Sequence, residues 1–291
     1  MPYPLANLAY GLQRRLRELA TPNERHRLQL AAGLTKMHIH PLQRHYKVNY
    51  MGCIQNIGRG LILGARADVN SHVKTSGFNL STLYSFDRFA LDGLEAKHLD
   101  DERFGSVYLN SQVLVLVSCA INDLFIKKLL RLYHGKPTMI EFYDCNLTNE
   151  DLFRRIVGKK YWKLEKLAFN RCAIPKNWQE LMQDVTGLRQ FCLYGPSDLI
   201  IKCSVDLLIK FIRNQNKQFN FEFCFTESFY ASYRIRTQIV GVLYPRLIYH
   251  TLFKPCISGQ NMTVSRVCPA GHKYEVRFFG VRGVFFNNEE R

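Results

Sequence analysis

The sequence predicts an α/β solenoid, with short parallel strands on a concave face and helices on a convex face. Three observations support this fold class. A pattern of two alternating apolar residues followed by a small residue recurs along the chain at intervals of 24 to 28 residues. Helix-like stretches lie between copies of the pattern. The chain has 291 residues, of which 47 % are hydrophobic, so it can bury a sizeable core.

The pattern apolar-x-apolar-x-x-Cys defines the repeating unit. It occurs as LVLVSCAI from Leu114, IEFYDCNL from Ile140 and LAFNRCAI from Leu167. The same template matches FALDGL, FCLYGP and FNFEFC, with Leu94, Pro196 and Cys224 in the cysteine position. A period of this length is typical of solenoids, because one unit cannot bury its apolar face alone and must stack on its neighbours.

The cysteine position follows each predicted strand. A thiol there could ligate a metal, act as a redox nucleophile, form half of a disulfide or be buried for packing. The two alternating apolar residues are expected to point into the core, and the small residue after them to lie where the chain turns. Because one position recurs in successive turns, we interpret four thiols as inert and buried: Cys119, Cys145, Cys172 and Cys224.

Four helix-like stretches are expected between the strands. The first begins at Asn122, and Thr148 with Asp151 forms a predicted capping box for the second. Pro175 opens the third, and Ser204 caps the fourth. Each unit is therefore expected to run from strand through turn and helix to the next strand.

The remaining strand residues are predicted to face outward into the concavity. They form a mixed and aromatic surface whose candidate partner-binding residues are Glu141, Tyr143, Asn170, Tyr194 and Glu222. Tyrosine is enriched among the residues that carry binding energy, so Tyr143 and Tyr194 are the candidate anchors. An ordinary sheet face partly covered by the C-terminal tail is the alternative interpretation.

A leucine-rich segment precedes the repeats. Five leucines at spacings of three and four predict one apolar helix face: Leu5, Leu8, Leu12, Leu16 and Leu19. Pro22 interrupts this helix, and a second short helix is expected from Glu24 to Ala32, ending at Gly33.

The form L-x-L-x-x-(N/C)-x-L resembles the cysteine-containing class of leucine-rich repeats. A helical segment that carries Pro4, Pro22 and the leucines precedes these repeats. This order of elements resembles that of F-box/leucine-rich-repeat proteins. This resemblance implies that the F-box docks on the Skp adaptor of a cullin ubiquitin ligase while the repeats hold the substrate. It places the adaptor-binding residues at Leu5, Leu8, Leu12 and Leu16. Alternatively, these helices only cap the open end of the solenoid.

Three regions are expected on this basis. Residues 1–45 form an F-box-like helical segment or N-terminal cap, residues 46–230 the solenoid with its clearest repeats over 89–226, and residues 231–291 a C-terminal capping region. The spacing of 41 residues from Cys53 to Leu94 is too long for one unit. A degenerate repeat or an insertion is expected there.

The charge is strongly basic, with a formal net value of +16, and half of the excess lies before residue 76. Such a surface suits nucleic acid, an acidic protein or an anionic membrane face, or is simply solvated. No long apolar run or secretory leader is present, so we expect no membrane span. We expect the protein to be cytoplasmic or nuclear. The nine cysteines lack the dense pairing of secreted scaffolds and are expected to be reduced.

Motifs for chemistry are weak. The glycines in IGRGLILG miss the dinucleotide fingerprint by one residue and are interpreted as a turn. Cys256, Cys268 and His272 lack a clear fourth zinc ligand, and RGVFF at Arg282 lacks a second RNA-binding motif. We therefore expect no catalytic residue, cofactor or metal, and a non-catalytic adaptor of a ubiquitin ligase. The alternatives are a leucine-rich-repeat scaffold unrelated to ubiquitin and a basic nucleic-acid-binding protein.

Overall fold

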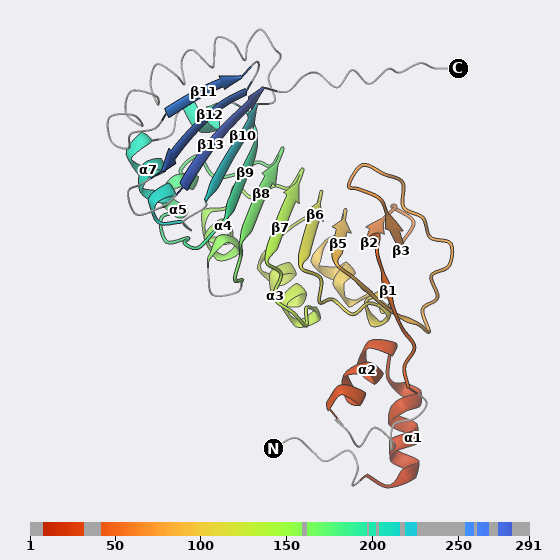
Figure 1. Cartoon of the computed structure of the whole chain (residues 1–291). Helices are drawn as coiled ribbons and strands as arrows, with labels where there is room; N and C mark the ends of the chain where they lie inside the picture. Colours follow the sequence, from red (N-terminus) through yellow and green to blue (C-terminus); the bar gives the residue numbers. More distant parts are fainter. Residues whose placement is uncertain are drawn as a thin grey trace, which may run out of the picture. The chain divides into compact units, whose positions relative to one another are not determined.

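The computed structural model describes most of the chain as an α/β protein with largely parallel strands (Figure 1). The chain divides into two compact units, residues Met1–Pro137 and Thr138–Arg291. Within the described ranges, every helix is too short or too polar to serve as a membrane span. The described residues are 8–31, 42–158, 162–196, 198–201, 204–215, 219–225, 254–258, 261–267 and 273–280.

The first unit begins with two helices and continues into strands. Strand β2 pairs antiparallel with β3 and parallel with β5, β5 pairs parallel with β6, and β1 pairs parallel with β4. The predicted helix after Asn122 is present as α3, and the Asn122 side-chain oxygen caps it by accepting the Phe125 backbone N–H at 2.8 Å. The elements are α1 (Tyr10–Leu19), α2 (Pro22–Ala31), β1 (His45–Val48), β2 (Met51–Asn56), β3 (Leu61–Arg66), β4 (Leu83–Phe86), β5 (Arg88–Asp92), the 3-10 helices η3 (Ala96–Asp100) and η4 (Glu102–Ser106), β6 (Val113–Val117) and α3 (Asp123–Leu132).

The second unit alternates strands with helices. Strands β7, β8, β9, β10 and β13 pair in parallel in that order, and β12 pairs antiparallel with β13 and β11. Helices α4, α5 and α7 follow one another along one side of these strands (Figure 1). The elements are β7 (Met139–Tyr143), α4 (Glu150–Val157), β8 (Lys166–Asn170), α5 (Trp178–Leu181), β9 (Gln190–Gly195), α6 (Asp198–Ile201), α7 (Val205–Arg213), β10 (Asn220–Phe225), β11 (Lys254–Ser258), β12 (Asn261–Val267) and β13 (Lys273–Gly280).

The predicted inward residues form the core of each unit. In the first five copies of the pattern, both alternating apolar side chains expose 1 % of their surface or less. In the second unit they stack as a ladder, with ring centroids 5.2 Å apart between Phe142 and Phe169 and 6.0 Å apart between Phe169 and Phe191. The inward positions of these strands are therefore confirmed: Phe89, Leu91, Leu114, Leu116, Ile140, Phe142, Leu167, Phe169, Phe191 and Leu193.

A left-handed residue ends four of the strands. The residue before the cysteine position has a positive φ in each case: 66° at Gly93, 48° at Ser118, and 53° at both Asp144 and Arg171. For residues other than glycine this conformation costs about 1–2 kcal/mol, so the surrounding packing must impose it. The chain is thereby turned sharply out of the strand direction after each of these strands.

The thiols that follow this turn are buried. Those of Cys119, Cys145 and Cys172 each donate a hydrogen bond to the backbone carbonyl two residues earlier, at 3.3 or 3.4 Å. Hydrogen bonding to Cys145, together with burial, raises the pKa of the Cys172 thiol. The prediction of buried thiols is confirmed at these three positions.

The sixth copy of the pattern was aligned wrongly. Phe221 lies opposite Phe191 and Phe223 lies opposite Leu193, so the inward pair of β10 is shifted by two residues from the predicted pair Phe219 and Phe221. Cys224 consequently lies within the strand, opposite Tyr194, and does not follow a turn. A Phe-x-Phe-x-Phe run fits the pattern in two registers, and only the pairing with β9 selects one.

Two helix starts also differ from the prediction. The N-cap of α4 is Asn149, whose side chain accepts the Leu152 backbone N–H at 2.9 Å, because the Thr148 hydroxyl is engaged by Asn146 in the preceding turn. Helix α5 begins at Trp178, after a turn in which Pro175 offers its carbonyl to the Trp178 N–H. The cap at Ser204 is confirmed by its 3.4 Å bond from the Leu207 N–H.

The long interval between Cys53 and Leu94 contains an insertion. Strands β2 and β3 form an antiparallel hairpin, after which a loop leads into β4. Gly58 and Gly60 have positive φ values in the hairpin turn, and the Ile57 N–H donates to the Gly60 carbonyl at 3.1 Å. The glycine motif is therefore a turn, as predicted.

Candidate functional site

Helix α1 carries the exposed part of the predicted leucine face. None of its ten residues is buried. Leu12 exposes 57 % of its surface, Leu16 39 % and Leu19 76 %. Leu8 lies just before the helix and is half-buried, and Leu5 falls outside the described residues. An amphipathic helix with its apolar face in solvent is a candidate docking element.

The junction of α1 and α2 is held by a reciprocal cap. Glu24 accepts hydrogen bonds from the Thr21 backbone N–H at 2.8 Å and from its hydroxyl at 3.0 Å. The Thr21 hydroxyl in turn accepts the Glu24 N–H at 3.3 Å. Pro22 occupies the first position of α2, where its missing N–H costs nothing. These bonds fix the direction in which the chain leaves α1.

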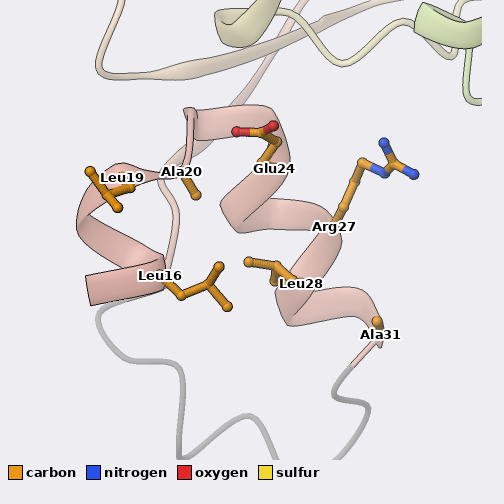
Figure 2. A pocket seen from close by; sticks show the side chains of 7 residues that line it. All are labelled: Leu16, Leu19, Ala20, Glu24, Arg27, Leu28 and Ala31. Atoms are coloured by element: carbon orange, nitrogen blue, oxygen red, sulfur yellow. The ribbon is translucent and has the colours of Figure 1, made fainter. Parts of the chain in front are cut away.

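A pocket of about 510 Å³ lies between the two helices (Figure 2). Leu16 and Leu28 point toward each other from α1 and α2, and Glu24 and Arg27 contribute one charge of each sign (Figure 2). The remaining lining residues are Leu19, Ala20 and Ala31. The pocket extends the apolar surface that the exposed α1 leucines provide.

Helix α2 is anchored on the rest of the first unit by polar groups. Buried Asn23 donates a hydrogen bond to the Val107 carbonyl at 3.2 Å and lies 3.1 Å from Nε2 of His134. Buried Gln29 accepts the Gln43 backbone N–H at 3.0 Å. Sequence reasoning missed this face, because polar residues on a short helix give no periodic apolar signal.

Aromatic rings complete the anchor. The His26 ring centroid lies 5.1 Å from that of Tyr108 and 5.2 Å from that of His45, and Tyr108 stacks on His134 at 5.0 Å. Burial lowers the pKa of both His45 and His134. The three histidines therefore form part of a packed contact between α2, strand β1 and the segments that follow η4 and α3.

The outward strand face in the second unit is only partly accessible. Glu141 is buried, forms an ion pair with Lys166 at 3.0 Å and accepts a hydrogen bond from the Tyr143 hydroxyl at 3.3 Å. It is therefore part of a network on the sheet, where a carboxylate needs a cationic partner to be buried. Glu141 alternates with the inward residues Ile140 and Phe142, so it lies on the outward face of β7, but it is buried there.

Three of the other predicted residues share a row. Tyr143, Asn170 and Tyr194 lie opposite one another on β7, β8 and β9, and each is half-buried. Glu222 belongs to the neighbouring row, opposite Cys192, whose thiol donates to its carboxylate at 3.4 Å. The structure thus brings the two candidate tyrosines to the same row and places Glu222 one row away.

A bidentate ion pair links neighbouring turns and was not predicted. Arg171 donates from Nε and Nη2 to the two carboxylate oxygens of Asp144, at 2.9 and 2.7 Å. Both residues occupy the left-handed position before a buried cysteine. The sequence did contain a signal for this ion pair, because an acidic and a basic residue occupy the position before the cysteine in successive copies of the pattern, 27 residues apart.

Comparison with known proteins does not assign this chain to a family. No protein-family model matches the chain, and no curated protein or solved structure shows significant similarity to it. Within the described ranges, no group of three histidine, cysteine, aspartate or glutamate side chains is placed to hold a metal ion. Cys268, His272 and the RGVFF motif lie outside those ranges. Function is therefore inferred from the chain's own residues.

Proposed function

We propose that this protein is a non-catalytic adaptor of a ubiquitin ligase. Helices α1 and α2 dock on a Skp-type adaptor of a cullin complex, and the outward strand face holds a protein substrate. The observation that carries the proposal is the solvent-exposed leucine face of α1 beside an apolar pocket. A helix that exposes its apolar face gains by burying it in a partner's groove.

The energetic argument concerns Leu12, Leu16 and Leu19. Full burial of a leucine side chain is worth about 1.5–3 kcal/mol. Three such residues on one helix therefore supply a substantial part of a micromolar affinity, about 8 kcal/mol, before the cost of association. The helix is presented in a fixed direction because the reciprocal cap joins it to α2, and α2 is anchored on the rest of the first unit.

For substrate binding, the proposal is that the strands and helices form leucine-rich repeats whose outward strand face holds the substrate. It is supported by the recurrence of an inward apolar pair, a left-handed turn residue and a buried thiol. The row of Tyr143, Asn170 and Tyr194 offers aromatic and amide groups to a protein partner. The same features suit a leucine-rich-repeat scaffold unrelated to ubiquitin, in which α1 and α2 only cap the repeats.

The test is co-purification with a Skp-type adaptor. We expect the wild-type chain to bind. The double variant Leu12→Asp/Leu16→Asp should lose at least about tenfold in affinity, because two charges would replace methyl groups that the complex buries against the adaptor. Leu124→Asp is the matched control, since Leu124 is equally exposed but lies on α3. Failure of the wild type to bind, or equal losses in both variants, would refute the adaptor function.

A further inference from the structure

Strand β3 forms an edge, because within the described ranges it pairs with β2 and with no other strand (Figure 1). On its other side the chain returns once, at an isolated antiparallel bridge between Ala65 and Lys74. Three residues after this bridge the chain turns at Gly77, whose φ is 90°. The part of β3 from Leu61 to Leu63 therefore has no described strand beside it on that side.

The backbone of this edge points away from β2 at every second residue. Ala65 and Lys74 exchange two hydrogen bonds, at 2.8 and 3.0 Å, so the N–H and carbonyl of Ala65 face away from β2. The register between β2 and β3 is continuous, without a bulge. Because these directions alternate along an antiparallel strand, the N–H and carbonyl groups of Leu61 and Leu63 also face away from β2.

The other residues of β3 bond to β2. Ile62 and Gly64 direct their N–H and carbonyl groups at that strand. The hairpin turn has the same phase, since the Ile57 N–H donates to the Gly60 carbonyl at 3.1 Å, two positions before Ile62. Within the described part of the chain, the outward backbone groups on either side of Ile62 thus have no strand to bond. An edge of this kind can accept a further strand.

Exposed cations lie at both ends of the open edge. Arg59 is in the hairpin turn, two residues before Leu61, and Lys74 is at the bridge that closes the other end. The first acidic residue after β3, Asp68, accepts a backbone N–H of its own loop at 2.8 Å. A second copy of this chain would bring like charges together at this edge, whereas an acidic strand would oppose the two cations.

We propose that the open edge of β3 binds an extended acidic peptide of a protein partner, which adds to the sheet as a further strand. The outward N–H and carbonyl groups of Leu61 and Leu63 pair with the backbone of the peptide. Peptide carboxylates lie against Arg59 and Lys74 and fix its position. The side chains of Leu61 and Leu63 stay in the core, at 6 % exposure each, so recognition uses the backbone and the flanking charges.

Hydrogen exchange of the free protein, read residue by residue by NMR, tests whether the edge is open. The amides of Leu61 and Leu63 should exchange at least about tenfold faster than those of Ile62 and Gly64, because only the latter two are bonded to β2. Equal protection of all four amides would overturn the proposal, since the edge would then already be covered.

Peptide binding tests the occupant, by fluorescence anisotropy on the full chain. We expect a labelled peptide of alternating glutamate and valine to bind and to protect the amides of Leu61 and Leu63. A peptide of alternating lysine and valine should not bind. Leu63→Pro removes the outward N–H and should weaken binding by about tenfold or more. Leu63→Ala is the matched control, because it shortens the side chain but keeps the N–H, and it should retain binding.

The flanking charges are tested separately. The double variant Arg59→Gln/Lys74→Gln should weaken binding of the glutamate peptide by about threefold or more, because it removes both cations beside the edge. The control is Lys127→Gln/Arg131→Gln, which removes the same charge from exposed residues of α3 and should leave binding unchanged.

Four results would overturn the acidic-strand site. These are no binding of the glutamate peptide, equal binding of the lysine peptide, equal losses in the two double variants, and binding that leaves the amides of Leu61 and Leu63 unprotected. Amide protection decides the question even if Leu63→Pro fails to fold. Dimerisation of the free chain in sedimentation, with protection of these amides, would assign the edge to a second copy and overturn the peptide as its occupant. The edge takes no part in adaptor docking, so each proposal can fail alone.

Discussion

Cys145 shows why one residue type recurs after the strands. Its buried thiol donates to the Tyr143 carbonyl across a turn in which Asp144 has a φ of 53°. The thiol fills a small space and donates a hydrogen bond to a backbone carbonyl, and this does not require burial of a strongly hydrated group. One repeated geometry therefore imposes one requirement on Cys119, Cys145 and Cys172.

Substitution of Cys145 should follow this geometry. Cys145→Ser should lower the free energy of unfolding by about 1–3 kcal/mol, because a hydroxyl is costlier to bury than a thiol, and Cys145→Ala should be milder. Urea unfolding of the two variants measures the difference. If serine were tolerated better than alanine, the hydrogen bond would outweigh the packing.

Native-state alkylation is the companion measurement. Among the cysteines whose side-chain burial the structure describes, Cys53, Cys119, Cys145 and Cys172 are buried and Cys192 is half-buried, so Cys192 should react before those four. Burial raises the pKa of Cys53 to about 12, so its reactive thiolate form is scarce at neutral pH. Rapid labelling of native Cys145 would contradict its assignment as an inert turn residue.

At the scale of elements, the docking of α2 depends on neutral histidines. Burial lowers the pKa of His45 below its usual value of 6.5, and burial with the nearby charges of Arg27 and His26 does the same for His134. The unfolded chain therefore takes up protons more readily than the folded chain. The resulting stability is fully present above pH 6.5 and is lost as the pH falls through the lower folded-state values.

We accordingly expect the first unit to be less stable at pH 5.5 than at pH 7.5, by a margin set by these two side chains. Urea unfolding at both values, followed by hydrogen exchange of α2, measures the effect. The double variant His45→Gln/His134→Gln should show a smaller pH response. His72→Gln is the control, because His72 is exposed and belongs to another part of the unit. An unchanged response in the double variant would rule out these residues as the source.

At the scale of the whole molecule, the net charge of +16 predicts weak attraction to any polyanion. If this attraction is only electrostatic, binding to RNA or DNA should be lost steeply between low and physiological salt, with a dissociation constant on the order of 10⁻⁴ to 10⁻⁶ M at the latter. Fluorescence anisotropy over a salt series measures this. Tight, sequence-dependent binding at physiological salt would favour a nucleic-acid-binding protein over an adaptor.

Local patterns of the sequence determined much of this protein. The alternating apolar residues specify which strand side chains enter the core, the cysteines mark the turns, and Asn122 and Ser204 cap the helices they precede. Each of these features depends on neighbours within one turn or one strand, so the residue types alone carry the information.

Only the tertiary structure decided the features that join distant residues. The run Phe219 to Phe223 fits two registers, and pairing with β9 selects the one that places Cys224 inside the strand. The polar anchor of α2 reaches from Asn23 to Val107, and the pairing of Arg66 with Asp92 spans 26 residues. These contacts satisfy buried polar groups across elements, and their partners are defined by folding rather than by spacing along the chain.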